Sequence, residues 1–426
     1  MEVALSRHRG YRSAMSKENT QLLITSLGHR GDGIAETSDG PVFVAGALPG
    51  ETVSAQVAGG RANHIRIEKP SPQRIAPICR HFDACGGCSV QHLASGAYLD
   101  WKRALVEKAL SDRGIEITVT PVVPGSSGTR RRAVLTAVRA GRHVLLGYHE
   151  KASHRLVDIR ECPVLVPEIV AALPDLRRLA EPLMPKKGEL RVTVLSTTAG
   201  LDVTFDQANR TYEQKIAQLS QLAVELDLAR LSVNGETLLE VRPPVLNMDG
   251  PAVVPPPGGF TQATLAAEAA LSELVMDGMG KPKKVADLFA GSGTFALRIA
   301  KSASVHAVEG DAAAIKALEN ALRIPKGLKQ VTIERRDLFR RPLMAEELNA
   351  YDAVVFDPPR AGAQAQAEQL ALSTVPRIAA VSCNPATLAR DLRLLIDGGY
   401  VLQSVTPVDQ FVFSPHIEVV ANLSRE

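Results

Sequence analysis

The chain has 426 residues, of which 45% are apolar and 22% are charged, with a formal net charge of +3. This composition is typical of globular proteins and excludes global disorder, and the length predicts two or three domains. No stretch approaches the roughly 20 apolar residues that a membrane span needs, and the N-terminus lacks the apolar core of a signal peptide, so we expect a cytoplasmic protein. The net charge is too small to indicate nucleic-acid binding. Arg130, Arg131 and Arg132 form a local basic cluster that is equally compatible with a solvated face.

The N-terminal part predicts a small β-rich domain. Residues 1–17 read as a loose N-terminus, in which Met15 is an alternative start. Residues 18–72 contain short strands with turn signals every 8–12 residues, which predicts a β-barrel. A cysteine-rich loop follows at 79–88, and apolar spacing predicts a helix over 94–112.

We expect residues 73–250 to form a central α+β domain. Strand-rich runs at 130–149 and 190–205 are followed by a helical segment near 212–223, but the topology cannot be inferred. The proline-rich stretch at 247–260 is typical of a linker.

Residues 251–426 predict a third domain, because strand and helix patterns alternate from residue 262 onward. Such alternation is typical of a doubly wound, mostly parallel α/β sheet whose ligands bind at the carboxyl ends of the strands. The expected strands are 285–290, 305–310, 331–337, 351–359 and 378–383, followed by two terminal strands.

Three features at successive strand ends indicate a nucleotide-like cofactor. Gly291 and Gly293 lie between a strand and a helix, where glycine lets a ligand approach the backbone and the helix N-terminus. Glu309 ends the second strand, where a carboxylate can accept hydrogen bonds from ribose hydroxyls. Asp337 ends the third, where it can accept from an adenine amine. A dinucleotide pocket is the alternative, since Ala296 is also allowed in that glycine motif.

The fourth and fifth strand ends carry reactive side chains. Asp357 precedes two prolines, an acidic motif that in methyltransferases often meets a nucleobase edge, and Cys383 ends an apolar strand. Carbon 5 of uracil is too poor a nucleophile to take a methyl group directly, and addition of a thiolate at carbon 6 would activate it. Glu418, on a terminal strand, is our candidate for the base that then removes the carbon-5 proton. A methyltransferase acting on adenine or guanine amines would need no such thiol.

Four other cysteines, Cys79, Cys85, Cys88 and Cys162, form a C-x5-C-x2-C pattern followed by one distant cysteine. Three thiols within ten residues of a cytoplasmic chain point to metal rather than to disulfides. Four thiolates suit either zinc or an iron–sulfur cluster, and a redox pair at 85–88 is a third possibility.

Together these motifs resemble the uracil-5 RNA methyltransferase family, in particular its ribosomal RNA branch with an N-terminal TRAM domain. The residues that carry the resemblance are the cysteine set, Glu309, Asp337 and the segments 47–51, 260–264, 287–295, 357–360, 382–385 and 416–418. The resemblance implies a Rossmann-like class I methyltransferase domain that uses S-adenosyl-L-methionine.

By this resemblance the cofactor pocket would contain Gln262, Phe289, Gly291, Thr294, Glu309, Asp337 and Asp357. Cys383 would be the nucleophile and Glu418 the proton acceptor. The four remaining cysteines would hold a [4Fe–4S] cluster. Thr264 and Thr294 depart from the family pattern, which more often has asparagine at both positions.

The resemblance also implies an RNA substrate. Ribosomal RNA is favoured and transfer RNA remains open, with no membrane association and no obligate protein partner indicated. An RNA-binding protein with a vestigial methyltransferase domain is the rival hypothesis, and an oligomerisation module is the alternative for the barrel.

Overall fold

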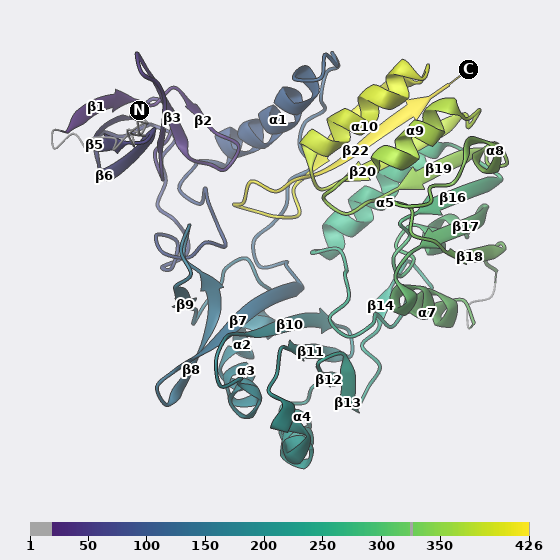
Figure 1. The fold of residues 1–426 in the computed structure, drawn as a ribbon, viewed down its shortest axis with the longest axis horizontal. Coiled ribbons are helices and arrows are strands. Elements are labelled where there is room, and N and C mark those ends of the chain that lie inside the picture. The colour runs from purple at the N-terminus through teal and green to yellow at the C-terminus, as the bar shows by residue number, and fades with distance from the viewer. Residues whose placement is uncertain (1–18, 324–326, 426) are drawn as a thin grey trace, which may run out of the picture. The chain divides into compact units, whose positions relative to one another are not determined.

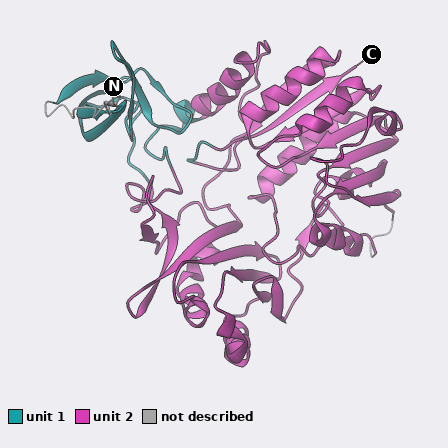
Figure 2. Cartoon of the chain, viewed as in Figure 1, with its two compact units in different colours: residues 1–77, 89–98, 413–415 teal, residues 78–88, 99–412, 416–426 magenta. Residues whose placement is uncertain are grey.

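The computed structural model describes residues 19–323 and 327–425, so the expected loose N-terminus lies outside the described residues. The chain forms two compact units, coloured separately in Figure 2. The smaller comprises the described residues up to 77 together with 89–98 and 413–415, and the larger contains the rest. Within the described ranges, no helix is both long and apolar enough to cross a membrane.

The smaller unit contains a six-stranded sheet in the order β1-β5-β6-β4-β3-β2. Alternating side chains such as Val42, Val44, Val53 and Ala55 are buried in its core, as expected for strands with one solvated face. This strand-rich unit agrees with the sequence prediction for residues 18–72. Its strands are β1 (Thr20–Leu23), β2 (Ser26–Leu27), β3 (Gly33–Thr37), β4 (Gly40–Val44), β5 (Thr52–Ala58) and β6 (Arg61–Lys69).

The central part of the larger unit is a seven-stranded sheet in the order β13-β12-β11-β10-β7-β8-β9. Its strands pair antiparallel except for β11 with β12. The strands are β7 (Arg132–Ala140), β8 (His143–His149), β9 (Leu156–Asp158), β10 (Leu190–Thr197), β11 (Gly200–Asp206), β12 (Arg230–Val233) and β13 (Glu236–Glu240). The helices are α2 (Pro167–Ala171), α3 (Leu173–Ala180), η1 (Glu181–Leu183), η2 (Arg210–Lys215) and α4 (Ile216–Glu225).

The C-terminal sheet has the order β18-β17-β16-β19-β20-β22-β21, in which β22 is the antiparallel strand. This is the doubly wound α/β arrangement that the sequence predicts. A short hairpin, β14 (Leu246–Asn247) and β15 (Ala252–Val253), occupies the expected linker. The strands of the large sheet are β16 (Lys284–Leu288), β17 (Ser304–Glu309), β18 (Val331–Arg335), β19 (Ala353–Phe356), β20 (Arg377–Ser382), β21 (Val401–Val408) and β22 (Glu418–Ser424).

Helices cover both faces of this sheet (Figure 1). One apolar core joins alternate strand residues such as Leu288 and Phe356 to α8 (Ala345–Leu348), α9 (Gln364–Leu372), α10 (Pro385–Asp397) and the later turns of α1 (Ser95–Ser111). The core on the other face joins Val285 and Val355 to α5 (Leu265–Met279), α6 (Ala296–Ile299) and α7 (Ala312–Ala321).

The helix expected from residue 293 is shorter than its pattern suggests. Gly293 has a φ of +97°, which is incompatible with a right-handed helix, so residues 291–295 form turns and α6 begins at Ala296. Helix α8, between β18 and β19, was not expected from the sequence.

Candidate active site

The side chains expected to carry chemistry lie at one edge of the C-terminal sheet. Glu309 ends β17, Asp357 follows β19, and Cys383 follows β20. These three strands are parallel, so their carboxyl ends meet at the same edge. Glu418 reaches that edge from the opposite direction, because it is the first residue of the antiparallel strand β22.

The glycine loop after β16 is held in left-handed backbone conformations. Phe289, Gly291 and Gly293 have φ values of +61°, +55° and +97°. Such a value is rare for a bulky residue like Phe289, and strain of this kind often accompanies a functional site. A Cβ atom on Gly293 would lie 2.6 Å from Leu318 Cδ1, so close packing also requires glycine there.

Glu309 is already bound to the glycine loop. Its Oε2 accepts a hydrogen bond from the Gly291 N–H at 2.9 Å, and its Oε1 accepts from the N–H groups of Gly310 and Asp311 at 2.7 Å each. Each carboxylate oxygen can accept more than one hydrogen bond, so these contacts leave capacity for a ligand. The hydrogen bond from Gly291 also means that Glu309 holds the glycine loop in place, a role that the sequence did not predict.

Asp337 holds the turn after β18. Its Oδ1 accepts a hydrogen bond from the N–H of Phe339 at 3.0 Å. The Phe339 ring lies 5.4 Å from the Phe289 ring, centroid to centroid, and Phe339 is 49% exposed. The exposed Phe339 ring, beside the partly buried Phe289 and a strand-end acid, provides an apolar surface for a flat ligand. Phe339 was missed in the sequence because it lies in a turn without a recognisable motif.

Cys383, the residue after β20, lies close to Glu418, the first residue of β22. Ser382 pairs with Val419 in the antiparallel β20–β22 ladder, which brings the next residue, Cys383, opposite Glu418. Burial, followed by the negative charges of Glu418 and Asp357, raises the pKa of the Cys383 thiol to about 11, while Arg360 opposes that rise. At neutral pH the thiol is therefore protonated in the absence of ligands.

The two carboxyl groups beside the thiol have unusually high pKa values. Burial raises the pKa of Asp357 to about 7. Burial, and then the charge of Asp357, raises the pKa of Glu418 to about 8, against opposing effects of Gln410 and Lys102. A carboxyl group with a pKa near neutrality is suited to general acid–base catalysis.

Gln262 and Gln410 connect these two carboxyl groups. Gln262, 2% exposed, donates from Nε2 towards Asp357 Oδ2 at 3.4 Å. Gln410, also 2% exposed, donates from Nε2 to Gln262 Oε1 at 2.8 Å and to Glu418 Oε1 at 2.9 Å. Gln410 was not among the residues predicted from the sequence, since a glutamine in a loop between two strands gives no signal.

A buried ion cluster holds the segment that contains Gln262. The guanidinium of Arg131 binds Glu268 Oε2 at 2.5 Å, and Arg298 binds Glu268 Oε1 at 2.7 Å and Asp249 at 2.8 Å. Arg131 Nε also donates to the Gln262 carbonyl oxygen at 3.2 Å. Arg131 is only 4% exposed, so it is not part of a solvated basic face.

Cys79, Cys85 and Cys162 lie within electrostatic range of one another, and Cys85, Cys88 and Cys162 all lie within range of Tyr148. Burial raises the pKa values of Cys85 and Cys162, and the charge of Cys79 raises both further. Loss of solvent, and then the charges of Cys162, Cys85 and Cys88, raise the pKa of the partly buried Tyr148. Among the described residues, however, no group of three or more His, Cys, Asp or Glu side chains is arranged as a metal site.

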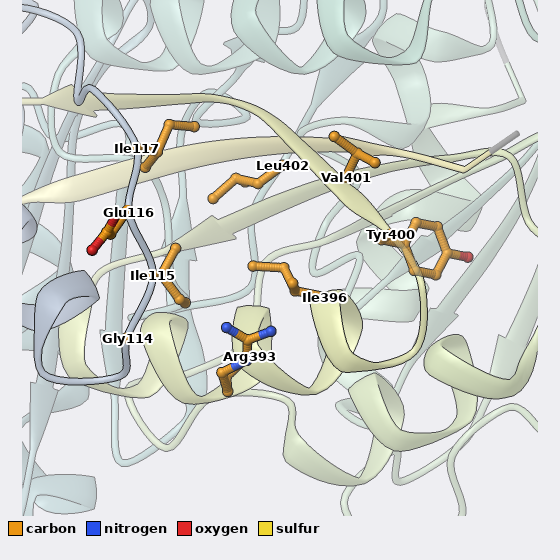
Figure 3. Close-up of a pocket in the computed structure, with 9 residues that line it drawn as sticks. All are labelled: Gly114, Ile115, Glu116, Ile117, Arg393, Ile396, Tyr400, Val401 and Leu402. Carbon is orange, nitrogen blue, oxygen red and sulfur yellow. The ribbon is translucent and has the colours of Figure 1, made fainter.

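A pocket of about 340 Å³ is lined by residues from the segment after α1, from α10 and from the start of β21, as Figure 3 shows. Ile115 and Ile117 line one side, and Arg393, Tyr400 and Leu402 line the other. None of the residues predicted to act in catalysis or cofactor binding contributes to it.

The sheet, the glycine loop and the strand-end acids define a class I methyltransferase. Residues 257–426 match the sequence profile of the tRNA (uracil-5-)-methyltransferase family, and residues 18–63 match that of the TRAM domain. The chain is 49% identical to an uncharacterised RNA methyltransferase of Rhizobium meliloti (strain 1021), with 94% of this chain and 98% of that protein covered. It therefore belongs to the S-adenosylmethionine-dependent RNA uracil-5-methyltransferases and is an enzyme of that family.

Two further comparisons concern named substrates. The chain is 35% identical to a 23S rRNA (uracil(1939)-C(5))-methyltransferase of Halomonas elongata, covering 96% of this chain and 90% of that one. The solved structure of the Pyrococcus abyssi tRNA (uracil-54, C5)-methyltransferase, in complex with S-adenosyl-L-homocysteine, is 25% identical with a TM-score of 0.73. That similarity covers 95% of this chain and 99% of the archaeal one.

Proposed function

We propose that this enzyme methylates carbon 5 of a uridine in 23S ribosomal RNA through a covalent adduct with Cys383. The observation that carries this proposal is the pairing of a thiol with a carboxyl group of raised pKa, Cys383 opposite Glu418, at the ligand-binding edge of the sheet. A methyltransferase acting on an exocyclic amine has no use for this pair.

In the proposed reaction Cys383 is the nucleophile and Glu418 is the base. The Cys383 thiol first loses its proton to solvent; the thiolate adds to carbon 6 of the uracil, and the electrons of the carbon 5–carbon 6 double bond become available at carbon 5. S-Adenosylmethionine would supply the methyl group that carbon 5 attacks, and S-adenosylhomocysteine would be the leaving group. Glu418 takes the proton from carbon 5, the double bond re-forms, and the Cys383 sulfur leaves as a thiolate.

Seven residues are proposed to line the cofactor pocket. Support comes from the partly buried Phe289, whose ring contacts the exposed Phe339, and from the left-handed turns at Gly291 and Gly293 after β16. The proposed set is Gln262, Phe289, Gly291, Thr294, Glu309, Asp337 and Asp357.

We further propose that Cys79, Cys85, Cys88 and Cys162 hold a [4Fe–4S] cluster. Support comes from the electrostatic effects among Cys79, Cys85 and Cys162 and from the shared effect of Cys85, Cys88 and Cys162 on Tyr148, and four thiolates are a donor set that such clusters take. The methyl transfer requires no electron, so we assign the cluster no step of the reaction. Zinc, which also binds four thiolates, is the alternative occupant.

The choice of ribosomal RNA rests on the Halomonas elongata relative, which is more similar in sequence than the archaeal tRNA enzyme. Transfer RNA is the second candidate. We assign general RNA binding to the TRAM-matching unit, where Arg61, Arg66 and Lys69 lie along the exposed strand β6. The three-domain division at residues 72 and 250 and a cytoplasmic location also remain predictions.

The covalent mechanism can be tested with two variants and two RNAs. Each protein is incubated with S-adenosylmethionine and transcribed 23S ribosomal RNA or transfer RNA, and then resolved by denaturing electrophoresis. Cys383→Ala should form neither product nor adduct. Glu418→Gln should accumulate a protein–RNA adduct, because it retains the nucleophile and lacks the base.

Glu319→Gln, an exposed change on α7, is the matched control and should behave like the parent enzyme. Normal turnover by Cys383→Ala would refute covalent catalysis. Methylation of transfer RNA but not of ribosomal RNA would replace the proposed substrate, and cofactor binding without methylation of either would favour a vestigial domain.

A further inference from the structure

Gln410 lies at the centre of a buried hydrogen-bond network, two residues after the end of β21. Its Oε1 accepts a hydrogen bond from the Ala263 backbone N–H at 2.8 Å. Its Nε2 donates to Gln262 at 2.8 Å and to Glu418 at 2.9 Å. The acceptor and both donor hydrogens of this amide are therefore used.

The backbone sets the orientation of this amide. The N–H of Ala263 can only donate, so it requires the oxygen of Gln410 on its side and directs the NH₂ group towards Gln262 and Glu418. Gln262 must then offer its own oxygen to Gln410, which leaves its NH₂ group facing Asp357. One backbone N–H thus fixes the direction of two side-chain amides, and Glu418 can only receive a hydrogen bond from Gln410.

The loop that carries Gln410 is itself held by a buried cation. Lys102 of α1 is fully buried and binds Asp409, the neighbour of Gln410, at 2.8 Å. It also donates to the carbonyl oxygens of Phe411 and His416. The residues on both sides of Gln410 are therefore anchored, and its side chain has little freedom to leave the network.

We propose that Gln410 is a positioning residue for proton abstraction. It holds Glu418 Oε1 in a fixed hydrogen bond, so that Oε2 is the oxygen that accepts the carbon-5 proton while the Cys383–carbon 6 bond breaks. The inference rests on the proposed function and adds a residue that never touches the substrate. It predicts a defect in the release of the methylated adduct and not in its formation.

The charged groups around Glu418 make this defect measurable as a pH profile. Asp357 and Lys102 act on Glu418 from the end of β19 and from α1, and the Cys383 thiol faces it from the end of β20. Gln410 donates a hydrogen bond to the ionised form of Glu418 and therefore favours the base. Loss of that donor should raise the pH at which release reaches half its maximal rate.

Two substitutions at Gln410 separate positioning from folding. Gln410→Leu removes the whole amide, whereas Gln410→Glu keeps the shape and an acceptor for Ala263 but offers no donor when ionised. The control is Gln403→Leu, an exposed glutamine of β21 whose amide donates to Ser424. Single-turnover experiments with 23S ribosomal RNA would follow adduct formation and release between pH 6 and pH 10, with thermal unfolding measured alongside.

Both Gln410 variants should form the methylated adduct within about threefold of the parent rate and release it at least about tenfold more slowly at pH 7.5. For Gln410→Glu the midpoint of the release profile should rise by about one pH unit or more. Release at the parent rate, or an equal loss of formation and release, would overturn the positioning role. If the parent protein itself forms neither adduct nor product, the proposed function has failed instead.

Discussion

The raised pKa of Glu418 leads to a quantitative prediction for the last step of the reaction. With a pKa of about 8, roughly one tenth of the carboxyl groups are ionised at pH 7 and roughly nine tenths at pH 9. Only the ionised form can accept the carbon-5 proton, so its share increases as pH rises. Breakdown of the methylated adduct should therefore accelerate about tenfold between pH 7 and pH 9.

Adduct breakdown can be measured separately from thiol addition. The separation is needed because thiol addition should also become faster at high pH, since the Cys383 pKa is about 11. The adduct is formed at pH 7, shifted rapidly to each test pH, and its decay followed by denaturing electrophoresis. Glu418→Gln should show no rise over this range and decay about 10² to 10⁴ times more slowly, the usual contribution of a general base. A parent decay rate that is the same at pH 7 and pH 9 would refute the base assignment.

Three further predictions concern binding, stability and metal content. Glu309→Ala should weaken S-adenosylmethionine binding by about 1–3 kcal/mol in calorimetry, because both a ligand acceptor and an anchor of the glycine loop are lost; unchanged affinity would remove Glu309 from the pocket. Arg131→Met should lower the free energy of unfolding in urea by about 3–5 kcal/mol, since Glu268 loses a buried partner, whereas Arg139→Met at an exposed position should have little effect. Anaerobically purified protein should be brown and contain iron and sulfide that Cys85→Ser loses; one zinc per chain would contradict the cluster.

Residues at the ends of parallel strands could be predicted from the sequence because two simple patterns locate them. A short apolar run marks each strand, and parallel pairing brings the carboxyl ends together, so Glu309, Asp357 and Cys383 could be grouped without coordinates. Glu418 followed from its position on a terminal strand. The functions of these residues remain proposals, but the structure does bring their positions to one edge of the sheet.

Contacts between distant segments could not be predicted in this way. Gln410 and Gln262 are 148 positions apart, and Arg131 and Glu268 are 137 apart. A buried amide or ion pair leaves no periodic signal in either segment. The order of the central sheet was equally hidden, because β11 and β12 pair in parallel across a long connection while their neighbours are antiparallel.

The assignment of residues 413–415 to the smaller unit affects how the protein can be engineered. Phe413 accepts hydrogen bonds at its carbonyl oxygen from the N–H groups of Ser89 and Val90, yet it lies between Gln410 and Glu418 in the chain. Deleting the N-terminal unit would therefore remove partners from the loop that carries Gln410 and leads into Glu418. In a truncated enzyme, a loss of RNA affinity could not be separated from damage to catalysis. Charge-reversal variants along β6 would test the proposed RNA binding and leave the loop intact.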